Sequence, residues 1–153
     1  NTLRQDLIDL AKQLRTFHLA LLDQVKYEYQ AKTGTKPSPF ELFNLVLNHD
    51  DFQWLRPLSR LMATLDEMID SKGPLTPNDL RQIESSLYGF FSPLEPAYTD
   101  FRREHARMKS EARVSETELA WRTRLAELRK TYLEDGLIDR EVDCRLGQSD
   151  GPL

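Results

Sequence analysis

The sequence predicts an all-α protein: an antiparallel helical bundle of four main helices plus one or two short helices. Three observations predict this class. Apolar residues recur every three or four positions along long segments, helix-capping patterns separate those segments, and no segment alternates apolar and polar residues over the length of a strand. The connections are only a few residues long, which favours antiparallel packing of consecutive helices.

The domain organisation follows from length and composition. A chain of 153 residues suits one domain, and 39% hydrophobic with 30% charged residues is typical of a folded protein. We expect the bundle over residues 1–135 and an acidic, mobile C-terminal tail over residues 136–153.

The first helix is predicted from residue 3 to residue 29, where apolar residues step by four and three along one stripe. Gly34 and Pro37 are expected to end it. Ser38, Pro39 and Glu41 then form a helix-start pattern. The short helix that follows, to about residue 48, is almost wholly apolar, so we expect it to be buried on more than one side.

The third helix is expected to take Asp50 or Asp51 as its N-cap. Pro57 lacks the N–H that an inner helical position needs, which predicts a kink or a short separate turn before residue 57. The stripe of this helix consists of Leu55, Leu58, Met62, Leu65 and Ile69.

Capping patterns also start the later helices. Thr76 opens a fourth helix, in which Gly89 is expected to mark close packing, a kink or a ligand-access point. Ser92 opens a fifth helix through residue 108. The last helix is expected from about Ser115 to Gly136 and presents a stripe at coiled-coil spacing, formed by Trp121, Leu125, Leu128 and Tyr132.

Charge and hydropathy argue against two classes of partner. The net charge of −4 disfavours a nucleic acid, which needs a positive surface, and no apolar run is long enough to cross a membrane. Without a signal-like leader the expected location is cytoplasmic, although a chain that starts with Asn leaves its native N-terminus open.

The charge is unevenly distributed along the chain. Residues 41–84 carry four basic and eight acidic side chains, whereas residues 102–130 carry nine basic and five acidic ones. Pairing between neighbouring helices is the expected use of these charges, and a basic docking patch is the alternative.

The densest polar cluster lies around the expected kink and consists of His49, Asp50, Asp51, Gln53 and Arg56, with Trp54 within it and Pro57 directly after it. One interpretation is a small-ligand or metal site, in which Arg56 clamps an anion and Trp54 forms a wall. The other is structural: an aspartate caps a helix, Arg56 pairs with an aspartate, and His49 lies at the negative end of the preceding helix.

Other chemistry has no pattern to support it. The sequence contains no Glu-x-x-His motif, phosphate-binding loop or nucleophile elbow. The single cysteine, Cys144, excludes an internal disulfide and a thiolate zinc site within one chain. His18 and His105 are expected to be hydrogen-bonded core or boundary residues. We therefore assign no catalytic residue, no metal ligand and no cofactor.

One segment carries a resemblance. The run His49-Asp50-Asp51-Phe52-Gln53-Trp54-Leu55-Arg56-Pro57-Leu58-Ser59, followed by Leu65-Asp66-Glu67, resembles a segment of small uncharacterised bacterial proteins predicted to be helical. The resemblance implies a bacterial cytosolic origin and a helical fold, and nothing about activity.

These observations favour a non-enzymatic bundle that acts by protein–protein contact, as a homodimer or as an accessory subunit of an unidentified partner. The alternative is a bundle that binds a small ligand or a metal at the kink near residues 49–56.

Overall fold

The computed structural model describes residues 2–134, and over that range the chain is all-helical, without a strand. The predicted fold class is confirmed in this respect. The expected tail over residues 136–153 and Cys144 lie outside the described residues. The α-helices are α1 (Thr2–Thr33), α2 (Pro39–Asn48), α3 (Arg56–Asp70), α4 (Pro77–Phe91), α5 (Thr99–Met108) and α6 (Ala112–Arg129). Two 3₁₀ turns and a π-helical turn complete the fold: η1 (Asp50–Leu55), η2 (Pro96–Tyr98) and η3 (Lys130–Glu134).

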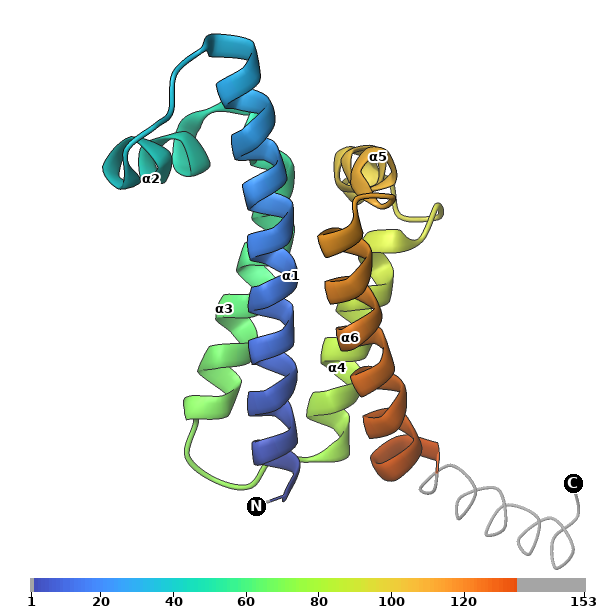
Figure 1. The fold of residues 1–153 in the computed structure, drawn as a ribbon. Helices are drawn as coiled ribbons and strands as arrows, with labels where there is room; N and C mark the ends of the chain where they lie inside the picture. Colours follow the sequence, from blue (N-terminus) through green and yellow to red (C-terminus); the bar gives the residue numbers. More distant parts are fainter. Residues whose placement is uncertain (1, 135–153) are drawn as a thin grey trace, which may run out of the picture.

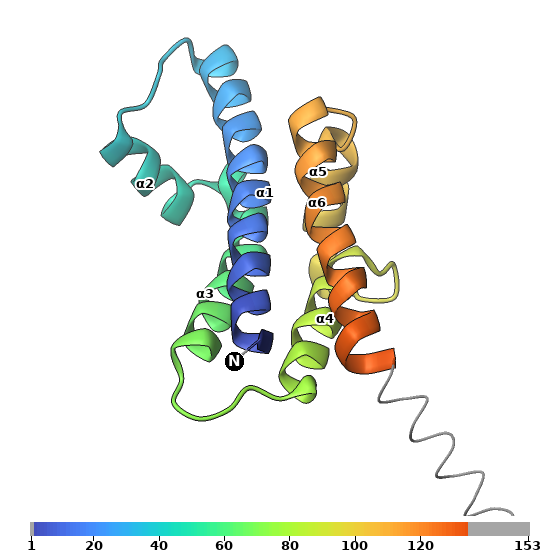
Figure 2. The same cartoon turned by 60° about the horizontal axis from the view of Figure 1, so that its bottom comes forward.

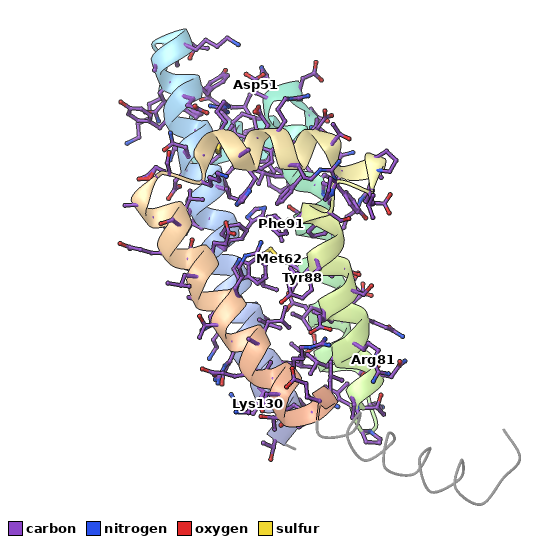
Figure 3. All side chains as sticks on the ribbon, turned by 90° about the vertical axis from the view of Figure 1, so that its right-hand side faces the viewer. Asp51, Met62, Arg81, Tyr88, Phe91 and Lys130 are labelled. Carbon is purple, nitrogen blue, oxygen red and sulfur yellow. The ribbon has the colours of Figure 1, made fainter. Side chains whose placement is uncertain are left out.

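The longest helix, α1, lies at the centre of the molecule, with α3 packed against one side and α6 against another (Figure 1). Along the long axis α1 and α4 run one way, while α3 and α6 run the other way (Figure 2). Helix α5 crosses the ends of α4 and α6 (Figure 3). Helix α2 stands out from the body beside the C-terminal half of α1.

The core confirms the predicted stripes. Leu7, Leu10, Leu14 and Leu21 of α1 are fully buried, because steps of three and four keep them on the face that meets α3 and α6. The other helices supply fully buried side chains to the same core, among them Leu58, Leu65, Leu80, Phe101, Trp121 and Leu125.

Several helix ends follow their predicted signals. Gly34 has a φ of +73° after α1, and its amide donates a 2.7 Å hydrogen bond to the carbonyl of Gln30. Before α4, the Thr76 amide donates to the carboxylate of Asp79 at 2.8 Å, which closes the expected capping box.

The predicted break before residue 57 is confirmed, since η1 ends at Leu55 and α3 begins at Arg56. Other boundary predictions are wrong. The N-cap of η1 is His49 rather than Asp50 or Asp51. Helix α5 begins at Thr99, because Pro96 starts the separate turn η2 after the Ser92 turn, and α6 begins at Ala112, ahead of the expected Ser115.

The prediction that α2 is buried is wrong. It was expected to be buried on more than one side, yet none of its ten residues is buried. Its principal neighbour is η1, so only one face of the helix has anything to pack against.

The expected pairing of charges within the chain is confirmed, but α1 supplies most of the partners. Arg107 pairs with Glu28, and Arg124 pairs with Asp9 at 3.1 Å. Of the acidic segment 41–84, Glu84 is the partner of Arg129, at 2.5 Å. These pairs join α5 and α6 to the helices that carry the core.

Candidate functional site

Two neighbouring features form the candidate site: the outer face of α2, and a pocket beside η1. Hydrogen bonds at the two ends of α2 contribute to how its outer face is presented. Ser38 caps the first turn, where its Oγ accepts a 3.2 Å hydrogen bond from the Glu41 amide. At the other end the side chains of Gln53 and Arg56 donate to the Leu47 carbonyl oxygen, at 3.1 Å and 2.8 Å. These bonds satisfy a carbonyl that the helix itself cannot pair.

The two faces of α2 are both apolar but differ in environment. The inner face packs against the core through the half-buried side chains of Leu42, Leu45 and Val46. The outer face carries Phe40, Phe43 and Leu47, whose exposed fractions are 74%, 60% and 45%. Spacings of three and four residues place these three side chains on one stripe. We name this stripe, together with the exposed Asn44 within it, the outer face of α2.

His49 and Arg56 stabilise the turn. His49 accepts the amide N–H of Asp51 at its Nδ1, at 3.1 Å, and its ring packs edge-on against Tyr29 and Phe52. Arg56 bonds to a carbonyl of α2 instead of pairing with Asp50 or Asp51. The structural interpretation of Arg56 as the partner of an aspartate is therefore wrong.

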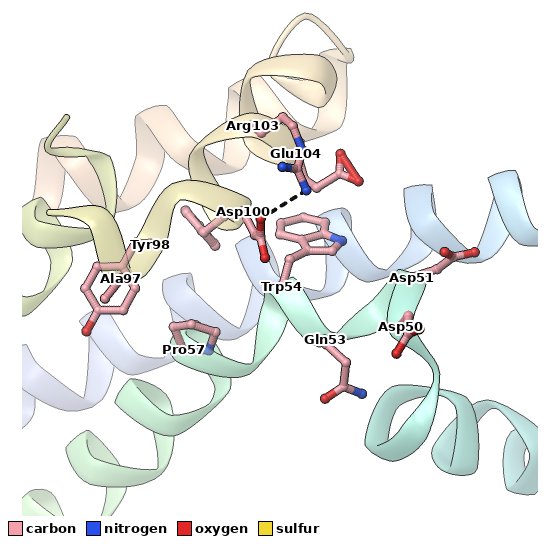
Figure 4. A pocket seen from close by; sticks show the side chains of 11 residues that line it. Asp50, Asp51, Gln53, Trp54, Pro57, Ala97, Tyr98, Asp100, Arg103 and Glu104 are labelled. Carbon is pink, nitrogen blue, oxygen red and sulfur yellow. Dashed lines mark ion pairs between the residues drawn. The ribbon is translucent and has the colours of Figure 1, made fainter.

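Asp50, Asp51 and Trp54 line a pocket of about 310 Å³ between η1 and α5 (Figure 4). His49 and Arg56 are not among its lining residues. The opposite wall comes from η2 and α5, including Asp100, Arg103 and Glu104. Three of the four lining carboxylates already have an ion-pair partner: Asp100 pairs with Arg103 at 3.1 Å, Glu104 with Arg107 at 3.1 Å and Asp51 with Lys32 at 3.7 Å. The lining is acidic, since it contains four carboxylates and one guanidinium.

Trp54 joins this pocket to the core. The side chain is 6% exposed, and its ring packs on Phe101 with the ring centroids 5.7 Å apart. Its indole Nε1 is buried and has no hydrogen-bond partner within residues 2–134. Trp54 therefore packs η1 against α5, and it also lines the pocket, as expected for the wall of a ligand site.

A second polar cluster lies inside the bundle. The buried His105 hydrogen-bonds through Nε2 to Glu118, which also accepts from Arg122 Nε at 2.8 Å. Burial raises the pKa of the Glu118 carboxyl, but these two hydrogen bonds outweigh it and hold the pKa below its usual value. Glu118 and Arg122 lie at i, i+4 spacing, which was the one signal in the sequence for this cluster.

The predicted roles of the other histidines are confirmed as far as their contacts show. His18 Nε2 lies 2.8 Å from the hydroxyl of Ser59, and burial lowers the pKa of His18. His105 is 8% exposed and stacks on Phe101. Both are hydrogen-bonded residues of the core or its boundary.

Residues 2–134 offer neither a metal-binding cluster nor a membrane-spanning helix. No group of three or more His, Cys, Asp or Glu side chains there is placed to hold a metal ion. None of the helices in that range combines the length and the apolar character that a membrane crossing requires. The chain matches no protein-family model, no curated protein and no solved structure, so the function has to be inferred from this geometry.

Proposed function

We propose that this protein acts by protein–protein contact and that the outer face of α2 is the contact surface. The observation that carries the proposal is the exposure of Phe40, Phe43 and Leu47 on one stripe of a helix that is apolar on both faces. Fully burying a side chain of this size contributes about 1.5–3 kcal/mol, and a partner that covers these three gains roughly the share of it that corresponds to their exposed fractions.

The arrangement of the remaining helices is consistent with a contact role for α2. In the proposal the body of the protein is an antiparallel bundle formed by α1, α3, α4 and α6, and α2 projects from it. The hydrogen bonds from Gln53 and Arg56 fix the C-terminal end of α2. A short helix that presents anchors at i, i+3 and i+7 is a common form of helix-mediated recognition.

A protein surface suits α2 better than a membrane surface or a nucleic acid does. The helix has one charged residue, Glu41, and contains no Lys or Arg. Helices that lie on membranes are rich in Lys and Arg on their polar face, and nucleic-acid contacts need the same residues. The proposed setting is the cytoplasm of a bacterium, as the resemblance of the His49–Ser59 segment implies.

Site-specific photo-crosslinking tests the proposal. A photoreactive phenylalanine analogue replaces Phe43 in the full chain, and the control places it at Leu119, an exposed apolar residue of α6. We expect irradiation of producing cells to give a discrete adduct from position 43 and none from position 119. Equal, diffuse labelling from both positions would contradict a contact role for α2.

A second candidate function is the binding of a small cationic ligand in the pocket beside η1. The observation that favours it is the acidic lining beside the Trp54 wall, in which Asp50 has no ion pair within the described residues, whereas Asp51 and Glu104 already pair with Lys32 and Arg107. The test measures the melting temperature with putrescine, spermidine and agmatine. Stabilisation that is lost in Asp50→Asn and kept in Asp66→Asn, outside the pocket, would support it. No shift with any of the three amines would remove it.

A further inference from the structure

We infer that the partner of the outer face of α2 is the same face of a second copy of this chain, packed antiparallel about a two-fold axis. This inference rests on the proposed contact function and specifies its partner. Four properties of α2 support it: the order of the side chains, the chemistry of Asn44, the scarcity of charge and the exposed apolar area.

The order of the side chains makes the stripe complementary to itself. Phe40 lies near the start of α2, Leu47 near its end, and Phe43 between them. When two such helices cross antiparallel about an axis near residues 43 and 44, Phe40 of one copy meets the partner's Leu47. The bulky aromatic ring therefore faces the smaller aliphatic side chain at both ends of the contact.

Asn44 is the polar residue within the otherwise apolar stripe. It lies in the middle of the stripe, it is exposed, and its side chain forms no hydrogen bond within the described part of the chain. A carboxamide is both donor and acceptor, so two Asn44 side chains near a two-fold axis can satisfy each other. A single asparagine within an apolar helix contact also favours one register over others.

Charge agrees with this arrangement. An acidic or a basic partner would find no complementary row on α2, whose only charged side chain is Glu41. Glu41 lies beside the stripe, about 100° around the helix from Phe40, where it stays in solvent when the stripe is covered. A neutral, self-matching stripe suits an isologous interface, the commonest kind in homo-oligomers.

The area predicts a weak dimer. We take a surface of roughly 200 Å² for each of these side chains. Multiplied by the exposed fractions of Phe40, Phe43 and Leu47, this gives an exposed apolar area of about 350 Å² per copy, so the dimer would bury about 700 Å² in total. Polar neighbours such as Asn48 add to this at the rim. Specific interfaces begin at about 1,000 Å², so the association is expected to be reversible and dependent on concentration.

Sedimentation velocity from about 10 μM to about 1 mM tests the inference, since mass action shifts a weak dimer over such a range. We expect the sedimentation coefficient to rise with concentration in the wild type and in Leu119→Glu, and to stay at the monomer value in Phe43→Glu. Both substituted side chains are exposed, so both variants should keep the wild-type circular dichroism.

A cysteine substitution tests the axis itself. In a Cys144→Ser background, Asn44→Cys should form a disulfide-linked dimer under mild oxidation, whereas Leu119→Cys should remain monomeric. A wild type that is monomeric at every concentration, together with a position-43 adduct of another protein, would overturn the inference and leave the contact function standing. A monomer without any adduct would overturn both.

Discussion

Arg56 donates a 2.8 Å hydrogen bond from its guanidinium to the carbonyl oxygen of Leu47, and so joins the first turn of α3 to the last turn of α2. Gln53 donates to the same oxygen from η1. None of the residues of α2 is fully buried, so these bonds add to the packing of half-buried Leu42, Leu45 and Val46 in attaching the helix to the body. The outer face of α2 is therefore presented by polar contacts at one end of the helix together with the half-buried inner face.

Loss of the Arg56 bond should loosen α2 selectively. We expect Arg56→Ala to lower the free energy of unfolding by about 1 kcal/mol, as for a typical hydrogen bond, and to speed amide exchange in α2 but not in α6. Hydrogen exchange with mass spectrometry measures both. Arg60→Ala, at an exposed position of α3, is the control. Equal effects of the two substitutions would show that Arg56 does not hold α2.

Gly89 should be replaceable by alanine with a gain in stability. A Cβ there would meet only the Tyr98 ring, at 4.0 Å, which is an ordinary contact. Gly89 lies in the last turn of α4, and alanine there is expected to stabilise the fold by about 0.4–1 kcal/mol, because it lowers the entropy of the unfolded chain. Gly34→Ala is the matched control and should destabilise by about 1 kcal/mol, because Gly34 has a φ of +73°. Urea unfolding measures both, and destabilisation by Gly89→Ala would indicate strain that the structure does not contain.

Glu118 predicts a pH-dependent contribution to stability. Its pKa in the folded state is below the ordinary 4.5, so the folded protein binds its proton less readily than the unfolded chain does. The contribution is therefore complete above about 4.5 and is lost as the pH falls through the lower folded value.

The measurement compares the free energy of unfolding of the wild type with that of Glu118→Gln. The substitution should destabilise at about pH 7, and the difference should shrink as the pH falls well below 4.5. A difference that does not change with pH would mean that the charge of Glu118 contributes nothing to the interactions with His105 and Arg122.

Much of the fold could be predicted because it depends on local rules. The α1 stripe, the capping box of Thr76 and Asp79, and the helix break before residue 57 each follow from neighbouring residues alone. The boundaries of α5 and α6 were missed because Pro96 opens a separate 3₁₀ turn before α5, and because α6 begins after Glu111, which has no capping side-chain hydrogen bond to mark the start.

The candidate site was predicted only in part. The apolar residues of α2 show that it needs cover, but periodicity does not say whether this chain or another protein supplies it. Asp50 and Trp54 do line a pocket, whereas the partner of Arg56 is a main-chain oxygen. Main-chain acceptors leave no trace in residue types, so no pattern could have identified that bond.

The most direct test of the central claim compares two identical substitutions on opposite faces of α2, Leu45→Ser and Leu47→Ser. Urea unfolding at about 1 μM, where a weak dimer is dissociated, should show Leu45→Ser less stable by about 1–2 kcal/mol and Leu47→Ser within about 0.5 kcal/mol of the wild type. Equal losses for both variants would mean that the outer face is packed within the single chain, and would contradict its role as a contact surface.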